Sequence, residues 1–194
     1  QVLPLQDAKE VIDIASPAAL MSCICRRMLR ARDERDAKTY TCMALGVGAF
    51  KWERWPERYK GGVEFPAPEE AKKWLEGWNK KGMVHLIMTA GTPYIGGICN
   101  CDYDCMALRI RLEYDIDFVI KAHYIAKVDF ESCNGCGDCL ERCQFGAIRK
   151  NVTLNKVYID PFKCYGCGLC ETGCTQEAIS LVDKASLHTL REVW

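Results

Sequence analysis

The chain has 194 residues, of which 49% are hydrophobic, enough to form one well-packed core or two small ones. Its 26 lysine and arginine residues balance 26 aspartate and glutamate residues, so no excess of positive charge is present to attract nucleic acid. No apolar run approaches the length of a membrane-spanning helix, and the first four residues are not typical of a signal peptide. We therefore expect no binding of nucleic acid and no membrane insertion. Because the chain begins without methionine, we expect a fragment or a processed chain.

Two helices and one strand are predicted in the first 126 residues. Apolar side chains at helical spacing predict a short amphipathic helix over residues 7–15. A second helix is predicted after Pro68, with Gly82 suited to the position just past its end. Its apolar residues follow the i, i+3, i+4, i+7 spacing: Ala71, Trp74, Leu75 and Trp78. We interpret these tryptophans as core anchors, and residues 83–88 as a buried strand.

Other segments of this half give weaker signals. Residues 25–38 are rich in arginine and permit a helix, and we interpret them as a solvated face. Residues 46–62 contain several glycines and are predicted to be rich in loops. His85 is a lone histidine in an apolar strand, which is more typical of a core residue than of a metal ligand.

Six cysteines of this half fall into two tight groups and a single residue. They are Cys23, Cys25, Cys42, Cys99, Cys101 and Cys105. A third metal centre would form if the CxC pair near residue 24 met the group near residue 100, and an iron–sulfur cluster is favoured over zinc. The alternative is a set of buried, inert cysteines that pack as small hydrophobic side chains.

The C-terminal part of the chain carries the same cysteine pattern twice, at an offset of 31 residues. The first copy is Cys133, Cys136, Cys139 and Cys143, and the second is Cys164, Cys167, Cys170 and Cys174. Three cysteines at i, i+3 and i+6, followed by a fourth four residues later, form the spacing of a bacterial-type pair of 4Fe–4S clusters. Val128-Asp129 and Ala147-Ile148 also recur as Ile159-Asp160 and Ala178-Ile179, which indicates an internal duplication.

In two-cluster ferredoxins the fourth cysteine of each run ligates the other cluster. This rule assigns one cluster to Cys133, Cys136, Cys139 and Cys174, and the second to Cys164, Cys167, Cys170 and Cys143. Zinc sites use paired CxxC motifs rather than runs of this kind, and disulfides require an oxidising compartment. The bacterial pattern has proline after the fourth cysteine, but Gln144 and Thr175 stand there. Because both side chains can donate hydrogen bonds, we expect them to act near the sulfurs and to raise the reduction potentials.

Motifs along nearly the whole chain resemble a family of anaerobic iron–sulfur proteins. The matching segments are Cys23-Ile-Cys-Arg26, Cys42-Met-Ala-Leu-Gly46, Glu69-Glu-Ala71, Gly82-Met-Val-His85 and Ile98-Cys-Asn-Cys101, ahead of the two cysteine runs. This resemblance implies CxCR, GLVH-type and ICNC-type motifs upstream of a two-cluster ferredoxin module. The chain departs from the family pattern at Asp102 and Asp104, where cysteines are common.

The predicted fold class is α+β: a C-terminal pseudo-symmetric two-cluster ferredoxin domain preceded by a small cysteine-rich α/β module. We expect the cysteine-rich module over residues 1–126, the ferredoxin domain over 127–184 and a tail over 185–194. The assembled clusters would make the protein acidic, since each oxidised cubane with four thiolates carries a charge of about −2.

The predicted function is electron transfer through two clusters, or three, between redox partner proteins in anaerobic metabolism. An independent enzyme is less favoured, and no catalytic residue is assigned. The alternatives are a catalytic iron–sulfur reductase subunit and a redox- or iron-sensing regulator. No glycine-rich nucleotide motif occurs, so we expect no nucleotide partner. Fourteen cysteines without a secretion signal indicate a reducing cytoplasmic setting.

Overall fold

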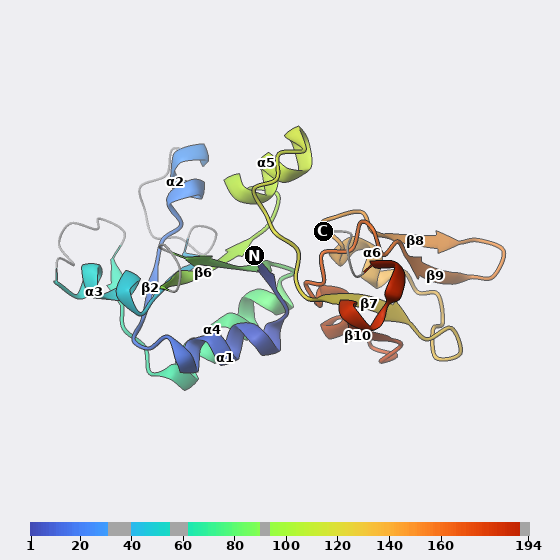
Figure 1. Ribbon diagram of the computed structural model, residues 1–194, viewed down its shortest axis with the longest axis horizontal. Coiled ribbons are helices and arrows are strands. Elements are labelled where there is room, and N and C mark those ends of the chain that lie inside the picture. The colour runs from blue at the N-terminus through green and yellow to red at the C-terminus, as the bar shows by residue number, and fades with distance from the viewer. Residues whose placement is uncertain (31–39, 55–61, 90–93, 191–194) are drawn as a thin grey trace.

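A computed structural model describes residues 1–30, 40–54, 62–89 and 94–190. The upstream part is built on a six-stranded sheet, with strand order β1-β5-β6-β3-β2-β4 (Figure 1). These strands are β1 (Val2–Leu3), β2 (Ala18–Met21), β3 (Cys42–Leu45), β4 (Val63–Glu64), β5 (Val84–Thr89) and β6 (Ile95–Cys101). All their pairings are antiparallel, which refines the expected α/β description to helices on an antiparallel sheet.

Helices cover both faces of this sheet. The elements are α1 (Leu5–Ile14), α2 (Ile24–Arg30), α3 (Val47–Arg54), α4 (Pro68–Lys80) and α5 (Met106–Tyr114). Figure 1 shows α1 and α4 side by side along one face and α2 and α5 beyond the other. On the first face, Ala8, Ile12 and Leu75 pack with strand residues into the main hydrophobic core.

The two predicted helices and the predicted strand are confirmed to within two residues at most ends. Helix α4 begins with Pro68, and the Glu70 carboxylate accepts a hydrogen bond from the Ala67 amide at 3.0 Å, which satisfies one free donor of the first turn. It ends before Gly82, whose φ of 81° suits the left-handed position after a helix. Trp78 is buried and Trp74 packs partly buried against the same core, so both act as anchors.

Other parts of the upstream half were predicted wrongly or not at all. Helix α3 occupies much of the segment that was expected to be loops. Strands β2 and β3 are short and almost wholly buried, so they lack the alternation that identifies a half-exposed strand. Of the arginine-rich stretch, residues 31–38 lie outside the described part of the chain.

The C-terminal part contains two separate strand pairs and two short helices. Strand β7 (Tyr124–Val128) pairs with β10 (Ile179–Asp183), and β8 (Ile148–Asn151) pairs with β9 (Lys156–Ile159). Helix α6 (Asp138–Arg142) and helix α7 (Leu169–Thr172) follow the two cysteine loops, and 3-10 turns follow at Lys184–Ser186 and His188–Leu190. The expected boundary at residue 127 falls inside β7. Among the described residues, no helix combines the length and apolar character needed to cross a membrane.

Candidate metal centres

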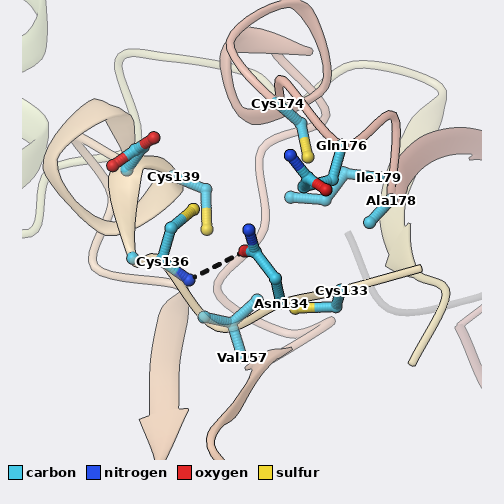
Figure 2. Close-up of a pocket in the computed structure, with 11 residues that line it drawn as sticks. Cys133, Asn134, Cys136, Cys139, Val157, Cys174, Gln176, Ala178 and Ile179 are labelled. Carbon is cyan, nitrogen blue, oxygen red and sulfur yellow. Dashed lines mark hydrogen bonds between the residues drawn. The ribbon is translucent and has the colours of Figure 1, made fainter. Parts of the chain in front are cut away.

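The first cavity of the C-terminal part is surrounded by thiols from both cysteine runs. Cys133, Cys136 and Cys139 approach it from one loop, and Cys174 approaches from the far end of the second run (Figure 2). About 320 Å³ of this space holds no protein atoms, and its remaining wall is mainly apolar, from residues such as Val157 and Ile179.

The second cavity is lined in the opposite way, with three thiols from the second run and one from the first. Cys164, Cys167 and Cys170 line it from the second loop, and Cys143 lines it from the end of the first run. About 340 Å³ of this space holds no protein atoms, nearly the same as in the first. Each cavity therefore has four thiols, three from one run and one from the other.

Backbone hydrogen bonds at the start of each cysteine loop recur at the offset of 31 residues. The Asp129 amide donates to the Ala178 carbonyl and the Asp160 amide donates to the Ala147 carbonyl, both at 2.8 Å. The amides of Cys133 and Cys164 donate in turn to the carbonyls of Asp129 and Asp160, at 3.1 and 3.0 Å. Both loops are thus held by the same local contacts, each anchored on the other half of the domain.

Amide groups also point at several sulfurs. The amides of Ala126 and Gly166 donate to the Cys164 sulfur at 3.5 and 3.4 Å, and the Ala147 amide donates to the Cys143 sulfur at 3.3 Å. Such N–H to sulfur bonds stabilise thiolates and raise the reduction potential of a bound cluster.

Burial favours the neutral thiol at these positions until metal binds. It raises the pKa of Cys139 to about 11 and the pKa of Cys167 to about 12, and it also raises the pKa of Cys170. Cluster binding must therefore displace these protons. All fourteen cysteines are free thiols, so none is withdrawn from metal binding by a disulfide. Two sets of four soft donors around two cavities fit two 4Fe–4S clusters.

Residues 132–178 match the family model of the 4Fe-4S dicluster domain. The chain carries two 4Fe–4S clusters. The matched segment is less than half of the chain and leaves the upstream motifs untested. Over 62 residues, the chain is also 32% identical to archaeal-type glutamate synthase [NADPH] from two Thermotoga strains, Thermotoga sp. RQ2 and Thermotoga maritima. That alignment covers 32% of this chain and only 12% of the length of those proteins.

The six upstream cysteines come together on one side of the six-stranded sheet. Cys42 and Cys99 are direct partners across β3 and β6, with their sulfurs 3.8 Å apart. Cys101 follows two residues later on the same face, and its sulfur lies 2.7 Å from that of Cys105, which precedes α5. The Cys23 thiol is within hydrogen-bonding range of those of Cys25, Cys42 and Cys105. The predicted meeting of the CxC pair with the group near residue 100 therefore takes place.

No three histidine, cysteine or acidic side chains in the described part of the chain are grouped so as to hold a single metal ion. This finding applies to the ferredoxin cysteines as much as to the upstream ones. Cubane ligands are spread around a polynuclear core rather than one ion, so the finding tests only mononuclear sites such as zinc.

His85 is a core residue, as predicted. It is fully buried, and its ring lies 2.6 Å from the Asn100 side-chain oxygen and 3.2 Å from the Asn79 amide nitrogen. Nδ1 therefore donates to Asn100 while Nε2 accepts from Asn79. Desolvation lowers the pKa of His85 to about 4, so the ring is neutral and both of its nitrogens are in use.

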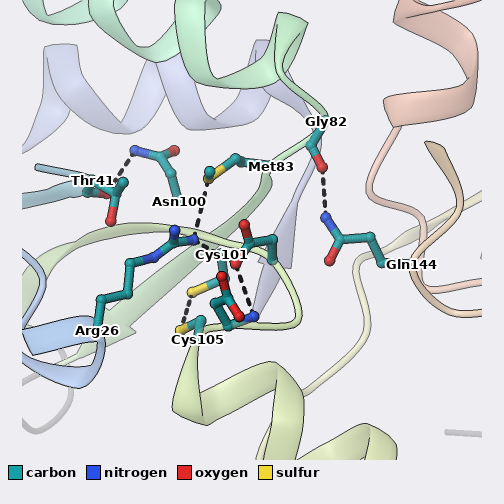
Figure 3. A network of polar contacts seen from close by, with 10 residues as sticks. Arg26, Thr41, Gly82, Met83, Asn100, Cys101, Cys105 and Gln144 are labelled. Carbon is teal, nitrogen blue, oxygen red and sulfur yellow. Dashed lines mark hydrogen bonds and ion pairs between the residues drawn. The ribbon is translucent and has the colours of Figure 1, made fainter. Parts of the chain in front are cut away.

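The interpretation of residues 25–38 as a solvated face is wrong for Arg26. Its side chain is buried, with only 1% exposed, and it forms an ion pair with Asp102 at 2.6 Å (Figure 3). The same guanidinium donates to the Met83 sulfur at 3.4 Å. The guanidinium is thus buried near Cys101 and Cys105, with its charge paired by the Asp102 carboxylate.

Two residues next to Cys143 connect the halves of the chain. Gln144 donates to the Gly82 carbonyl at 2.6 Å, so its amide contacts the upstream half rather than acting on a sulfur as expected. Arg142 donates to the carbonyls of Asn79 and Leu169, at 3.0 and 2.7 Å. Sequence reasoning did not find this link, because its acceptors in the upstream half, the carbonyls of Gly82 and Asn79, are main-chain groups that carry no residue signature.

Proposed function

We propose that the protein is an electron carrier, or the electron-transfer subunit of an oxidoreductase, in which two cubanes exchange single electrons with redox partner proteins. The observation that carries this proposal is the division of eight thiols between two cavities of nearly equal volume. The partial likeness to glutamate synthase supports an oxidoreductase setting. The upstream motifs and the fourteen cysteines favour an anaerobic, cytoplasmic setting for this role.

The proposed ligands follow the crossed arrangement. The first cubane is held by Cys133, Cys136, Cys139 and Cys174, and the second by Cys164, Cys167, Cys170 and Cys143. The lining of the two cavities supports this assignment, because each cavity meets one cysteine from the opposite run. The recurring hydrogen bonds at the loop starts support the pseudo-symmetry of the domain.

The first cubane is the more accessible of the two to a partner. Cys136 is exposed, whereas each cysteine of the second set is buried or half-buried. Electron tunnelling needs a thin protein covering, so a partner would exchange electrons at the Cys136 side.

Four serine variants test the ligand assignment as two matched pairs. A hydroxyl is a poor substitute for a thiolate, so each variant should lose mainly one cluster. We expect Cys174→Ser and Cys133→Ser to leave the same residual paramagnetic spectrum after reduction, and Cys143→Ser and Cys164→Ser to leave the other. Thr175→Ser, which changes an exposed neighbour of Cys174, is the control and should keep both signals. If Cys174→Ser instead leaves the spectrum of Cys164→Ser, the crossed assignment is wrong.

A reductive titration tests the function itself. The anaerobic protein should accept at least two single electrons per chain and return them to an oxidised viologen. Clusters that are present but do not exchange electrons would contradict the role of carrier.

A further inference from the structure

The six upstream thiols form one continuous group of sulfur contacts. The Cys42 sulfur lies 3.8 Å from that of Cys99 and interacts with the Cys23 thiol, and Cys99 also interacts with Cys101. Cys105 then closes the group by contacting Cys101 and Cys23. The thiols come from three separate stretches of the chain, which are residues 23–25, residue 42 and residues 99–105. Cysteines used only as small apolar fillers have no reason to gather on one another.

The donor set favours a polynuclear sulfur-bound centre. Thiolates without histidine or carboxylate select soft metals such as iron–sulfur clusters, copper(I) or zinc. The described residues contain no group arranged for a single ion, and the eight ferredoxin thiols, which hold clusters, share that property. The buried Arg26, paired with Asp102 between Cys101 and Cys105, brings N–H donors to the edge of this group of thiols.

The apolar clusters indicate which of the two cubane ligand sets packs against the upstream thiols. One apolar cluster contains cysteines of both cubane sets, including Cys133 and Cys139 together with Cys164 and Cys170. A different apolar cluster joins the upstream thiols to the second set alone. Its members include Cys99, Cys101 and Cys105 on one side, and Tyr165, Cys167 and Leu169 on the other.

A polar path crosses the same boundary. Gln144, which follows Cys143, donates to Gly82, and the next residue, Met83, accepts from Arg26 (Figure 3). Arg26 in turn binds Asp102, which adjoins Cys101. Both contacts link the upstream thiols to the ligand set of the second cubane.

We propose that the six upstream thiols hold a third iron–sulfur cluster, and that the second cubane lies between it and the first, so that the three form a single electron path. The proposal rests on the proposed role as an electron carrier and adds the order of its centres. In this order, an electron given to the first cubane near the exposed Cys136 would pass to the second cubane and from there to the upstream cluster. Each step oxidises one centre and reduces the next by one electron, with no bond made or broken.

Iron and acid-labile sulfide in the anaerobically purified full chain test whether the cluster exists. We expect more than eight irons per chain, and about twelve if the third centre is a cubane. Cys42→Ser and Cys99→Ser should lose only the additional iron and keep the paramagnetic signals of the two ferredoxin cubanes. Should both variants fail to fold, the iron and sulfide content of the parent protein still decides the matter.

Three results would overturn the third cluster. Eight irons alone would show that the upstream thiols bind no metal. Eight irons with one zinc would show a structural ion, and a disulfide between Cys101 and Cys105, detected by thiol alkylation and mass analysis, would show a redox dithiol. In each case exchange of electrons with viologen would persist, so the proposed carrier function would stand while this inference failed.

The order of centres has its own test by rapid-freeze spectroscopy. In the parent protein, a reduced one-electron donor protein should produce the signal of the upstream cluster shortly after that of the first cubane. In Cys164→Ser, which removes the second cubane, the upstream signal should be lost on that time scale, although dithionite still reduces the cluster on prolonged incubation. Unchanged kinetics in Cys164→Ser would contradict the order.

Discussion

Gly166 lies in the loop of the second cysteine run, where a single methyl group should disrupt a cluster. Its φ is 67°, a conformation that costs an L-residue about 1–2 kcal/mol. A Cβ added there would lie 2.9 Å from the Tyr124 carbonyl carbon and 3.0 Å from the Ala122 Cβ, and it would overlap the Tyr124 carbonyl oxygen more severely. These neighbours belong to β7 and the segment before it, so rotation of a side chain cannot relieve the overlap.

Overpacking of this kind costs about 1–3 kcal/mol, which brings the expected destabilisation of Gly166→Ala to about 2–5 kcal/mol. The loop must move, and with it the amide that donates to the Cys164 sulfur and the Tyr165 carbonyl that accepts from Ala122 at 3.0 Å. We therefore expect the second cubane to be lost, with a fall of about four irons per chain. Iron analysis, visible absorption and anaerobic thermal unfolding measure these effects.

Gly146→Ala is the matched control. Gly146 also has a positive φ, 61°, but nothing lies within 4 Å of an added Cβ. This variant should lose only about 1–2 kcal/mol and keep all of its iron. If Gly166→Ala retains both clusters and melts like Gly146→Ala, the close approach of the second loop to β7 does not govern cluster binding.

Two further predictions concern the upstream module and its link to the clusters. The pKa of His85 is lowered to about 4 from an ordinary value of 6.5, so the unfolded chain binds the extra proton between these values. The free energy of unfolding should therefore fall by about 2 kcal/mol from about pH 7 to about pH 5. His85→Gln, which cannot take up that proton, should be less stable at neutral pH but show a smaller pH slope in denaturant titrations; an equal slope would contradict the buried neutral ring. Arg142→Met removes a charged donor from the carbonyls of Asn79 and Leu169, at a cost of about 2–3 kcal/mol. Amide hydrogen exchange should rise at the C-terminal end of α4 while both cubanes remain, and unchanged exchange there would show that the contact does not hold the halves together.

The clusters were predictable from sequence because their ligands are local. Three of the four thiols of each proposed set occur within seven residues, and the loop between them can be read from spacing and glycine alone. The same holds for α1 and α4, whose apolar periodicity spans two or more turns.

The upstream site depends on register, which no local pattern supplies. Cys42 meets Cys99 only because β3 and β6 pair antiparallel with these two residues opposite, 57 positions apart in the chain. A shift of one residue would have sent one of the two side chains to the other face of the sheet. The grouping of the cysteines in sequence indicated a meeting, but the contacts among all six follow from a strand pairing that short buried strands did not reveal.

The contact of Gln144 is another that no local sequence pattern could predict. Gln144 stands where the bacterial two-cluster pattern has proline, and its side chain can donate a hydrogen bond. From the sequence we expected the nearby sulfurs to be the acceptors. The acceptor is instead a main-chain oxygen 62 residues earlier, at Gly82. Proline has no side-chain donor and could not make this hydrogen bond. Glutamine at this position joins the end of the first cysteine run, where Cys143 lies, to the segment that carries Met83, whose sulfur accepts from Arg26 near Cys101 and Cys105. Gln144, which we first expected to raise the reduction potential of a cluster, therefore helps to attach the ferredoxin domain to the upstream module. It also bears on which of the two clusters faces that module.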